Sequence, residues 1–260
     1  MADTIADAPP LDGRMSLMEH LIELRSRLIK CAIAIAIGSA LGWVLYNPVL
    51  SFLREPLESL SKDPNVSEKL RVLGPLDGFM LRIKMSAYIG IAVCMPYLLW
   101  QVWRFISPGL YQNERRYATA FVFSASFLFL FGAWVAYFTL PPALSFLTTV
   151  GGDNISYEFT PENYLMLIVY MMLAFGVGFE FPIVLVALQM VGVLKPQQLR
   201  DFRRFGIVII FVIAAVITPS ADPISLFALA IPMMIFYELS ILIGLLLARR
   251  RDTAAAGSGG

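Results

Sequence analysis

Residues 164–191 read YLMLIVYMMLAFGVGFEFPIVLVALQMV, a long apolar run in which Glu180 is the only charged side chain. An α-helix needs about 20 such residues to cross ~30 Å of hydrocarbon. Similar runs occupy residues 28–46, 79–102, 117–140 and 226–247, and a shorter one occupies 205–217. The chain is 58% hydrophobic and 15% charged, with a mean hydropathy of +0.72, whereas soluble domains carry about 25% charged residues. The sequence therefore predicts an all-α polytopic membrane protein with six transmembrane helices, and it argues against a soluble enzyme.

The two ends of the chain differ in composition from the apolar runs. Residues 1–15 are acidic and proline-bearing, without the basic start or small-residue cleavage site of a signal peptide. We therefore expect a disordered cytoplasmic tail over 1–15, one six-helix transmembrane domain over 16–250, and a flexible tail over 251–260. The two cysteines, Cys31 and Cys94, both lie inside apolar runs, which argues against a disulfide framework.

Lysine and arginine are unevenly distributed between the loops. They gather before the first run, after the second, after the fourth and at the C-terminus, whereas residues 141–163 and 219–225 contain none. Because cytoplasmic loops carry an excess of basic residues, both termini are predicted to lie in the cytoplasm. The basic residues on that side are Arg14, Arg25, Arg27, Lys30, Arg104, Arg115, Arg116, Lys195, Arg200, Arg203, Arg204, Arg249, Arg250 and Arg251.

Two observations bear on the limits of the spans. Indole rings prefer the headgroup interface, and all the tryptophans lie near the ends of runs: Trp43, Trp100, Trp103 and Trp134. The run 205–217 would form a helix only about 20 Å long. Two interpretations remain open: the bilayer adapts to a short span, or the helix is longer and Arg203 and Arg204 snorkel to the surface.

A short amphipathic segment precedes the first run. Ser16 and Glu19 have the spacing of a capping box, and the leucines at 17, 21, 24 and 28 share one helical face. Such a helix is expected at the cytoplasmic surface, with Glu23 close to Arg25 and Arg27. The residues alone permit a solvated Glu23–Arg27 pair, worth roughly a few tenths of a kcal/mol, or a carboxylate that binds a ligand.

The segment between the second and third runs permits similar alternatives. Pro108 and Gly109 break the chain, and Asn113 is a candidate N-cap for the third helix. Glu114 would then lie at the positive end of the helix dipole. Helix capping and ligand binding are both open roles for this carboxylate.

Glu180 is a third polar feature. It lies about 18 Å of helix before Gly192, near the middle of the membrane, where an ionisable group is costly and is by default a functional candidate. Pro182 removes a backbone donor two residues later, so a kink is expected there.

Several kinds of chemistry lack a motif in this sequence. His20 is the only histidine, and it lies outside the apolar runs, so neither an intramembrane zinc motif nor a Ser–His dyad is available. A glycine loop of the Walker type is also missing. We therefore predict no metal, no cofactor, no ATP hydrolysis by this chain and no nucleic-acid partner.

Three motifs together resemble one protein family. They read HLIELRSR at 20–27, FISPGLYQNERR at 105–116 and FGVGFEFP at 175–182. Their order, spacing and six-span layout are similar to those of TatC, the polytopic subunit of the bacterial twin-arginine translocase, over residues 16–250. The resemblance implies kinked spans that form a concave, glove-like bundle in the bacterial cytoplasmic (inner) membrane. It also implies a receptor, rather than an enzyme, that binds the twin-arginine signal peptides of folded precursor proteins.

The resemblance assigns roles at the cytoplasmic face. It implies that the signal's arginine pair is bound by Glu23 and Glu114, since carboxylates form charge-assisted, often bidentate hydrogen bonds with guanidinium groups. The other residues implied at this signal-peptide site are Arg25, Arg27, Phe105 and Leu110.

Further roles concern the partner subunits. In the family, spans five and six dock the single-span subunits TatA and TatB, and Asp222 matches a family position at the turn between these spans. Many relatives carry a glutamine where this chain has Leu226, so Thr218 or Ser225 would supply the polar contact instead. Glu180 would face the concave interior, and self-association is expected. The resemblance also matches Pro56 to a family position in the first outer loop. With the chain break at Pro108 and the kink at Pro182, it completes the predicted structural and loop prolines.

Two other classes of function remain to be distinguished. A secondary transporter would also explain a buried carboxylate, but it would usually show inverted repeats and paired broken helices, and the two halves show no repeat. A scaffold that only holds partner helices would explain the short hairpin of spans five and six. It would leave the paired cytoplasmic carboxylates without a role.

Overall fold

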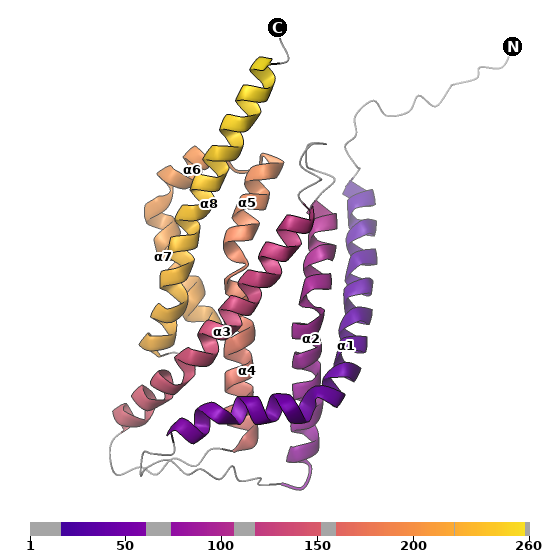
Figure 1. Ribbon diagram of the computed structural model, residues 1–260, viewed down its shortest axis with the longest axis vertical. Helices are drawn as coiled ribbons and strands as arrows, with labels where there is room; N and C mark the ends of the chain where they lie inside the picture. The colour runs from indigo at the N-terminus through magenta and orange to yellow at the C-terminus, as the bar shows by residue number, and fades with distance from the viewer. Residues whose placement is uncertain (1–16, 61–73, 107–117, 152–159, 221, 258–260) are drawn as a thin grey trace, which may run out of the picture.

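The computed structural model describes residues 17–60, 74–106, 118–151, 160–220 and 222–257, and the regular structure in these ranges is α-helical (Figure 1). The all-α prediction is thereby confirmed, whereas the predicted tail 1–15 lies outside the described residues. Helix α8 continues to Gly257, so residues 251–257 of the predicted tail are helical, as the alanines at 254–256 favour. The helices are α1 (Leu17–Leu60), α2 (Asp77–Ile106), α3 (Ala118–Gly151), α4 (Pro161–Gly178), α5 (Phe181–Val191), α6 (Pro196–Asp201), α7 (Arg203–Ile217) and α8 (Pro223–Gly257).

Five helical segments of the described chain are long and apolar enough to cross a membrane. They are provided by α1, α2, α3, the consecutive pair α4–α5, and α8. Helix α7 has 15 residues, about 22 Å, and falls short of the ~30 Å hydrocarbon core. It begins at Arg203, so the helix extends two residues beyond the apolar run and includes Arg203 and Arg204 in its first turn.

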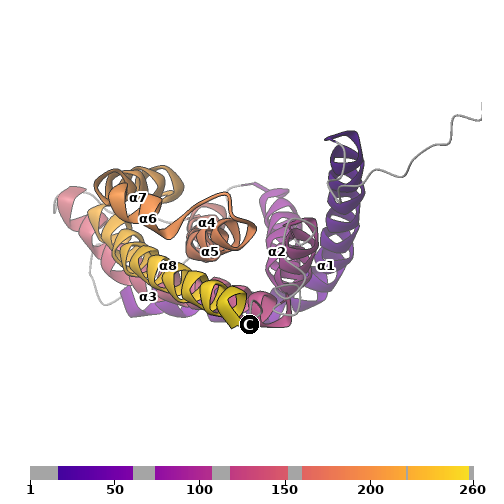
Figure 2. The same cartoon turned by 90° about the horizontal axis from the view of Figure 1, so that it is seen from above.

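The helices stand side by side in a curved row. Seen from above, α1 and α7 lie at the two ends of the row, with α2 and the α4–α5 pair between them, while α3 and α8 run along one side (Figure 2). Helix α4 forms the centre of the core, because five of its side chains are at most 1% exposed: Tyr164, Leu165, Ile168, Met171 and Phe175. The opposite side of the row is concave, as expected from the family resemblance.

Helix α1 bends in its second half, which crosses α2 and α4 near their lower ends (Figure 1). Pro48 and Pro56 both lie inside this helix, and each removes a backbone donor and crowds the preceding turn, which produces kinks. The expectation that Pro56 lies in a loop is therefore wrong.

Two tyrosines stabilise the bent half of α1. The Tyr137 hydroxyl donates to the Phe52 carbonyl at 3.2 Å, and the Tyr164 hydroxyl donates to the Leu53 carbonyl at 3.1 Å. The Phe52 carbonyl is the one to which Pro56 cannot donate, so α3 supplies the missing bond. Membrane helices tolerate proline where neighbouring helices satisfy the freed backbone groups in this way.

The kink predicted at Pro182 is confirmed. Helix α4 ends at Gly178 and α5 begins at Phe181. Between them, the Glu180 N–H donates to the Val177 carbonyl at 3.1 Å, which is the tighter i→i−3 spacing. Because Pro182 has no N–H, the ladder cannot continue through this point, and Glu180 lies at the break.

Helices α1 and α2 approach each other through glycines. A Cβ atom added at Gly90 would lie 2.4 Å from the Ser39 nitrogen, and one added at Gly42 would lie 2.3 Å from the Ser86 carbonyl oxygen. Close backbone approach at small residues is a common packing mode of membrane helices. The position of α1 against α2 is therefore fixed within narrow limits.

The tryptophans mark the interface less well than their sequence positions indicated. Trp134 lies in the middle of α3, because this helix continues to Gly151. Trp103 is 2% exposed and packs against Phe121 with ring centroids 4.3 Å apart. Burial between helices explains Trp103, so these two residues give no information on the headgroup level.

Candidate functional site

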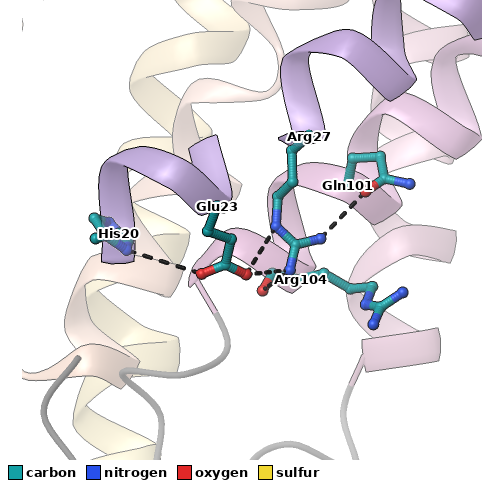
Figure 3. Close-up of polar contacts among 5 residues, drawn as sticks. All are labelled: His20, Glu23, Arg27, Gln101 and Arg104. Carbon is teal, nitrogen blue, oxygen red and sulfur yellow. Dashed lines mark hydrogen bonds and ion pairs between the residues drawn. The ribbon is translucent and has the colours of Figure 1, made fainter. Parts of the chain in front are cut away.

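A polar cluster joins the beginning of α1 to the end of α2. The Glu23 and Arg27 side chains lie one turn apart on the same face of α1. The Arg27 Nε donates to Glu23 Oε1 at 3.0 Å, and its Nη2 forms a second, shorter contact with the same oxygen (Figure 3). The ion pair considered from the sequence therefore exists, and it leaves the second carboxylate oxygen to be accounted for.

Arg27 also binds α2. Its Nη1 donates to Gln101 Oε1 at 3.2 Å, and its Nη2 donates to the Arg104 carbonyl at 3.0 Å (Figure 3). Helix α2 ends at Ile106, so the Arg104 carbonyl is among the last four, which have no partner within the helix. One guanidinium thus fixes the carboxylate of α1 and caps the end of α2.

The second oxygen of Glu23 remains open as an acceptor. Its Oε2 has no hydrogen-bond partner in the described chain, although it is buried, and His20 Nδ1 lies 4.0 Å from it. The His20 ring stacks on Phe105, with centroids 4.2 Å apart. The Glu23 side chain is 19% exposed and that of Arg27 is 14% exposed, so the pair is largely screened from water. A buried acceptor without a donor is costly, and it is suited to receive a donor from a ligand.

The structure brings together some of the site residues predicted from the sequence. Glu23, Arg27 and Phe105 lie in the cluster, whereas Arg25 is exposed and, two residues from Glu23, points to a different side of α1. Pro108, Leu110 and Glu114 lie outside the described residues.

The sequence reasoning missed two members of the cluster. His20 was noted only as the sole histidine, and Gln101 was not considered. Gln101 is 5% exposed, and an amide inside an apolar run is the signal that would have identified it, because a buried polar group requires a partner.

Glu180 lies apart from this cluster, at the break between α4 and α5. It is 8% exposed, and its Oε1 has no hydrogen-bond partner in the described chain. The neighbouring Phe179 packs against Phe131 and Phe236, with ring centroids 5.8 and 5.4 Å away. The carboxyl is therefore buried next to a residue that packs among aromatic rings. A group of three potential metal ligands does not occur in the described ranges.

The turn between α7 and α8 buries its polar side chains. Asp222 accepts a hydrogen bond from the Ser225 N–H at 2.7 Å, which is an N-cap for α8, and a second from the Ser220 hydroxyl at 2.5 Å. Thr218 donates to the Ala214 carbonyl at 2.8 Å. Thr218, Asp222 and Ser225 are each at most 4% exposed, and Leu226 is half-buried. These side chains stabilise the hairpin from inside.

The fold and the cluster together define a class of protein. Long apolar helices cross a membrane, and where two of them meet at one end, a largely buried carboxylate offers an unused acceptor. This is a multi-pass membrane protein with a candidate binding site for a cationic group at one face.

Comparisons with known proteins identify the family. The family model described as Sec-independent protein translocase protein (TatC) matches residues 19–232. The Sec-independent protein translocase protein TatC of Aquifex aeolicus (strain VF5) is 40% identical over 240 residues, which are 91% of this chain and 98% of that protein. The TatC of Frankia casuarinae is 36% identical over 255 residues, 94% of this chain and 70% of its own length.

Two solved structures are similar to the whole fold. Both are crystal structures of a twin arginine translocase receptor, TatC, one of them in DDM. They match with TM-scores of 0.71 and 0.73 at 39% identity, covering 87% and 86% of this chain and 98% and 99% of theirs. The chain belongs to the TatC family, and it is accordingly a component of a protein translocase rather than an enzyme.

Proposed function

We propose that this chain is the receptor subunit of a bacterial twin-arginine translocase and that it binds the signal peptides of folded precursor proteins through Glu23 and Glu114. The observation that carries the proposal is the open Oε2 of Glu23, which is buried and has no donor among the residues that the structure describes. An arginine of the signal would donate to this oxygen. Such charge-assisted bonds are about twice as strong as neutral ones.

The charges of the cluster support a second carboxylate at the site. Glu23 and Arg27 together are neutral, so they cannot by themselves balance two further guanidinium groups. Glu114, on the segment that follows α2, would supply the missing negative charge. Arg27 is held by Gln101 and the Arg104 carbonyl, and this would keep it in place when another cation approaches.

The apolar part of the signal would pack beside the carboxylates. Phe105 is half-buried at the end of α2 and stacks on His20, and Leu110 follows it in the sequence. We assign both side chains to the apolar residues that follow the arginine pair. The exposed Arg25 would act at the rim of the site.

Six spans with both termini in the cytoplasm are part of the proposal. The beginning of α1, which carries the cluster, and the end of α8 lie at the same end of the bundle (Figure 1), and the basic residues concentrate in the segments of that end. Helix α7 would be the short fifth span, for which the bilayer thins locally. Residues 16–250 would form one domain in the cytoplasmic (inner) membrane.

The α7–α8 hairpin is the proposed docking site for TatA and TatB. Val208, Val212 and Val216 form an exposed apolar stripe along α7, suited to a single-span partner helix. The roles of Thr218, Asp222, Ser225 and Leu226 in docking would be to fix the turn beside that stripe. Self-association of the receptor and contact with the bilayer complete the proposed set of partners.

Photocrosslinking tests the proposal. A twin-arginine signal peptide carries a photoreactive residue next to its arginines, and it is compared with a twin-lysine peptide on the membrane-embedded chain. Glu23→Gln and Glu114→Gln should each lower crosslinking about 10-fold or more, since bonds to charged groups contribute roughly 1.5–3 kcal/mol. Glu238→Gln, at the same end but paired with Arg203, is the control and should leave crosslinking unchanged.

Two results would contradict the assignment. Equal crosslinking of both peptides would mean that the carboxylates do not recognise guanidinium geometry. Unchanged crosslinking in both glutamine variants would reduce Glu23 and Glu114 to surface and capping charges, and the scaffold interpretation would then be favoured.

A further inference from the structure

The connection between α6 and α7 is an exposed elbow, which we define as residues 200–205. Every residue of the elbow is exposed, whereas the residues on either side of it, Leu199 and Gly206, are buried. The Tyr237 hydroxyl of α8 donates to the Leu199 carbonyl at 2.7 Å, and the Tyr237 ring lies so close to Gly206 that a Cβ there would be 2.9 Å away. The elbow is thus rigidly attached to α8, although its own side chains face outward.

Two of the three arginines on the elbow form no ion pair with any residue that the structure describes. Arg203 is neutralised by Glu238 of α8, with 2.7 Å between Nη2 and Oε2. Arg200 and Arg204 have no ion pair in the described part of the chain, and the one carboxylate on the elbow is that of Asp201. Guanidinium groups bind phosphate oxygens bidentately. Two of them on a rigid support, with little opposing negative charge, favour a phosphate-bearing ligand.

Aromatic rings accompany these cations. Phe202 and Phe205 are 48% and 63% exposed, and their rings stack with centroids 5.1 Å apart. Exposed phenyl rings next to exposed guanidinium groups would be unfavourable in bulk water, because large apolar surface is left uncovered. At the membrane interface each part has a suitable environment: the rings lie among the first acyl carbons and the cations lie among the headgroups.

We propose that the elbow is a binding site for anionic phospholipid headgroups in the leaflet on the side of the chain termini. Arg200 and Arg204 bind the phosphate, while Phe202 and Phe205 insert between the acyl chains below it. Basic surfaces at the cytoplasmic ends of membrane helices recognise anionic lipids by this combination. The site also holds the first residues of the short helix α7 at the membrane surface on the side of the chain termini. Because α7 is shorter than the hydrocarbon core, its other end, at the α7–α8 turn, then falls short of the opposite surface.

The test uses a local reporter in the full-length chain. Phe205→Trp places an indole on the elbow, and the chain is reconstituted in phosphatidylcholine vesicles that contain dibrominated phosphatidylglycerol or dibrominated phosphatidylcholine. The bromine atoms quench the fluorescence of nearby tryptophans. The quenching measured for the parent chain, which contains only the native tryptophans, is subtracted to leave the signal of the residue at 205. Each arginine near an anionic surface contributes about a fivefold preference. Arg204→Gln should therefore lower the preference for phosphatidylglycerol about fivefold, and Arg200→Gln with Arg204→Gln about 25-fold.

Control variants and competitors identify the ligand. Arg54→Gln removes an exposed arginine at the other end of the molecule and should leave the preference unchanged. Equal quenching by both brominated lipids, or a preference that survives loss of both arginines, would overturn the proposal. Displacement of the brominated lipid by soluble glycerol phosphate or by an acidic peptide would also overturn it, since the elbow would then be a site for free anions or for a protein. Signal-peptide crosslinking measured in the same vesicles reports separately on the receptor function.

Discussion

Substitution of Gly90 by alanine should damage the peptide site from a distance. The added Cβ would lie 2.4 Å from the Ser39 nitrogen, whereas ordinary contacts of a Cβ begin at 3.4 Å. The three nearest opposing atoms all belong to the backbone of α1, so α1 and α2 must separate by about 1 Å, since neither backbone can give way locally. The Arg27–Gln101 bond joins the same two helices at 3.2 Å. If the helices separated by the same 1 Å at that point, the distance from Arg27 Nη1 to Gln101 Oε1 would exceed 4 Å, at which no hydrogen bond remains.

The expected cost follows from two opposing effects. Overpacking of a close contact costs about 1–3 kcal/mol, and the better helix propensity of alanine offsets up to about 1 kcal/mol. A net loss of about 1–2 kcal/mol corresponds to a Tm lower by about 2–8 °C for a chain of this size. Twin-arginine peptide crosslinking should fall as well, although no residue of the site has been changed.

The assay compares Gly90→Ala with Gly78→Ala in the same helix. A Cβ at Gly78 would meet nothing within 4 Å, so this control should keep or slightly raise the Tm and preserve crosslinking. Thermal unfolding in detergent gives the first quantity and peptide crosslinking gives the second. If the two variants behaved alike in both measurements, the glycine contact would not set the geometry of the site and the reasoning would be refuted.

Three further predictions concern the scaffold. Tyr164→Phe removes a buried hydrogen bond between α4 and the Leu53 carbonyl of α1 and should cost about 1–2 kcal/mol in thermal unfolding. Tyr137→Phe removes an exposed hydrogen bond and should cost less. A larger loss of stability in Tyr137→Phe than in Tyr164→Phe would contradict the argument that the buried bond contributes more. Asp222→Ala removes the N-cap of α8 and should lower stability by about 1–2 kcal/mol, whereas Asp222→Asn, which keeps the acceptor, should retain most of it; equal losses would exclude capping. Pro182→Ala restores a backbone donor and should straighten α4–α5, so that spin labels at residues 163 and 193 move apart. An unchanged distance would mean that surrounding packing, and not the proline, maintains the kink.

The class of fold was predictable because a membrane imposes a simple rule on sequence. Each long apolar run became a helix, and the proline after Glu180 predicted the break between α4 and α5. The ends of the helices were harder to predict from the sequence, since α1 continues through Pro48 and Pro56 to Leu60. The hydroxyl groups that stabilise this half of α1 come from residues more than 80 positions away, and hydropathy along a window contains no information about them.

The candidate site was predictable in its charged residues but not in its geometry. A motif can mark Glu23 and Arg27 as important, yet it cannot show that one carboxylate oxygen is occupied and the other is open. That distinction depends on Gln101 and the carbonyl of Arg104, which approach from α2. The polar residues of the α7–α8 turn show a related difficulty. Asp222 looks like a surface contact in the sequence, and the structure gives it an internal role as a helix cap.

The position of the α7–α8 turn has a practical meaning for experiments on membrane topology. The turn ends well short of the level reached by the lower ends of α3 and α4 (Figure 1), and its hydroxyl and carboxyl groups are turned inward. A hydropathy plot presents residues 218–222 as an outside loop suited to an epitope tag or a reporter fusion. In the proposed six-span topology, an inserted tag would instead carry unpaired amides into the hydrocarbon, where each costs several kcal/mol. Loss of function after such an insertion would therefore report a collapsed hairpin, and poor labelling there should not be taken as a sign of inverted orientation.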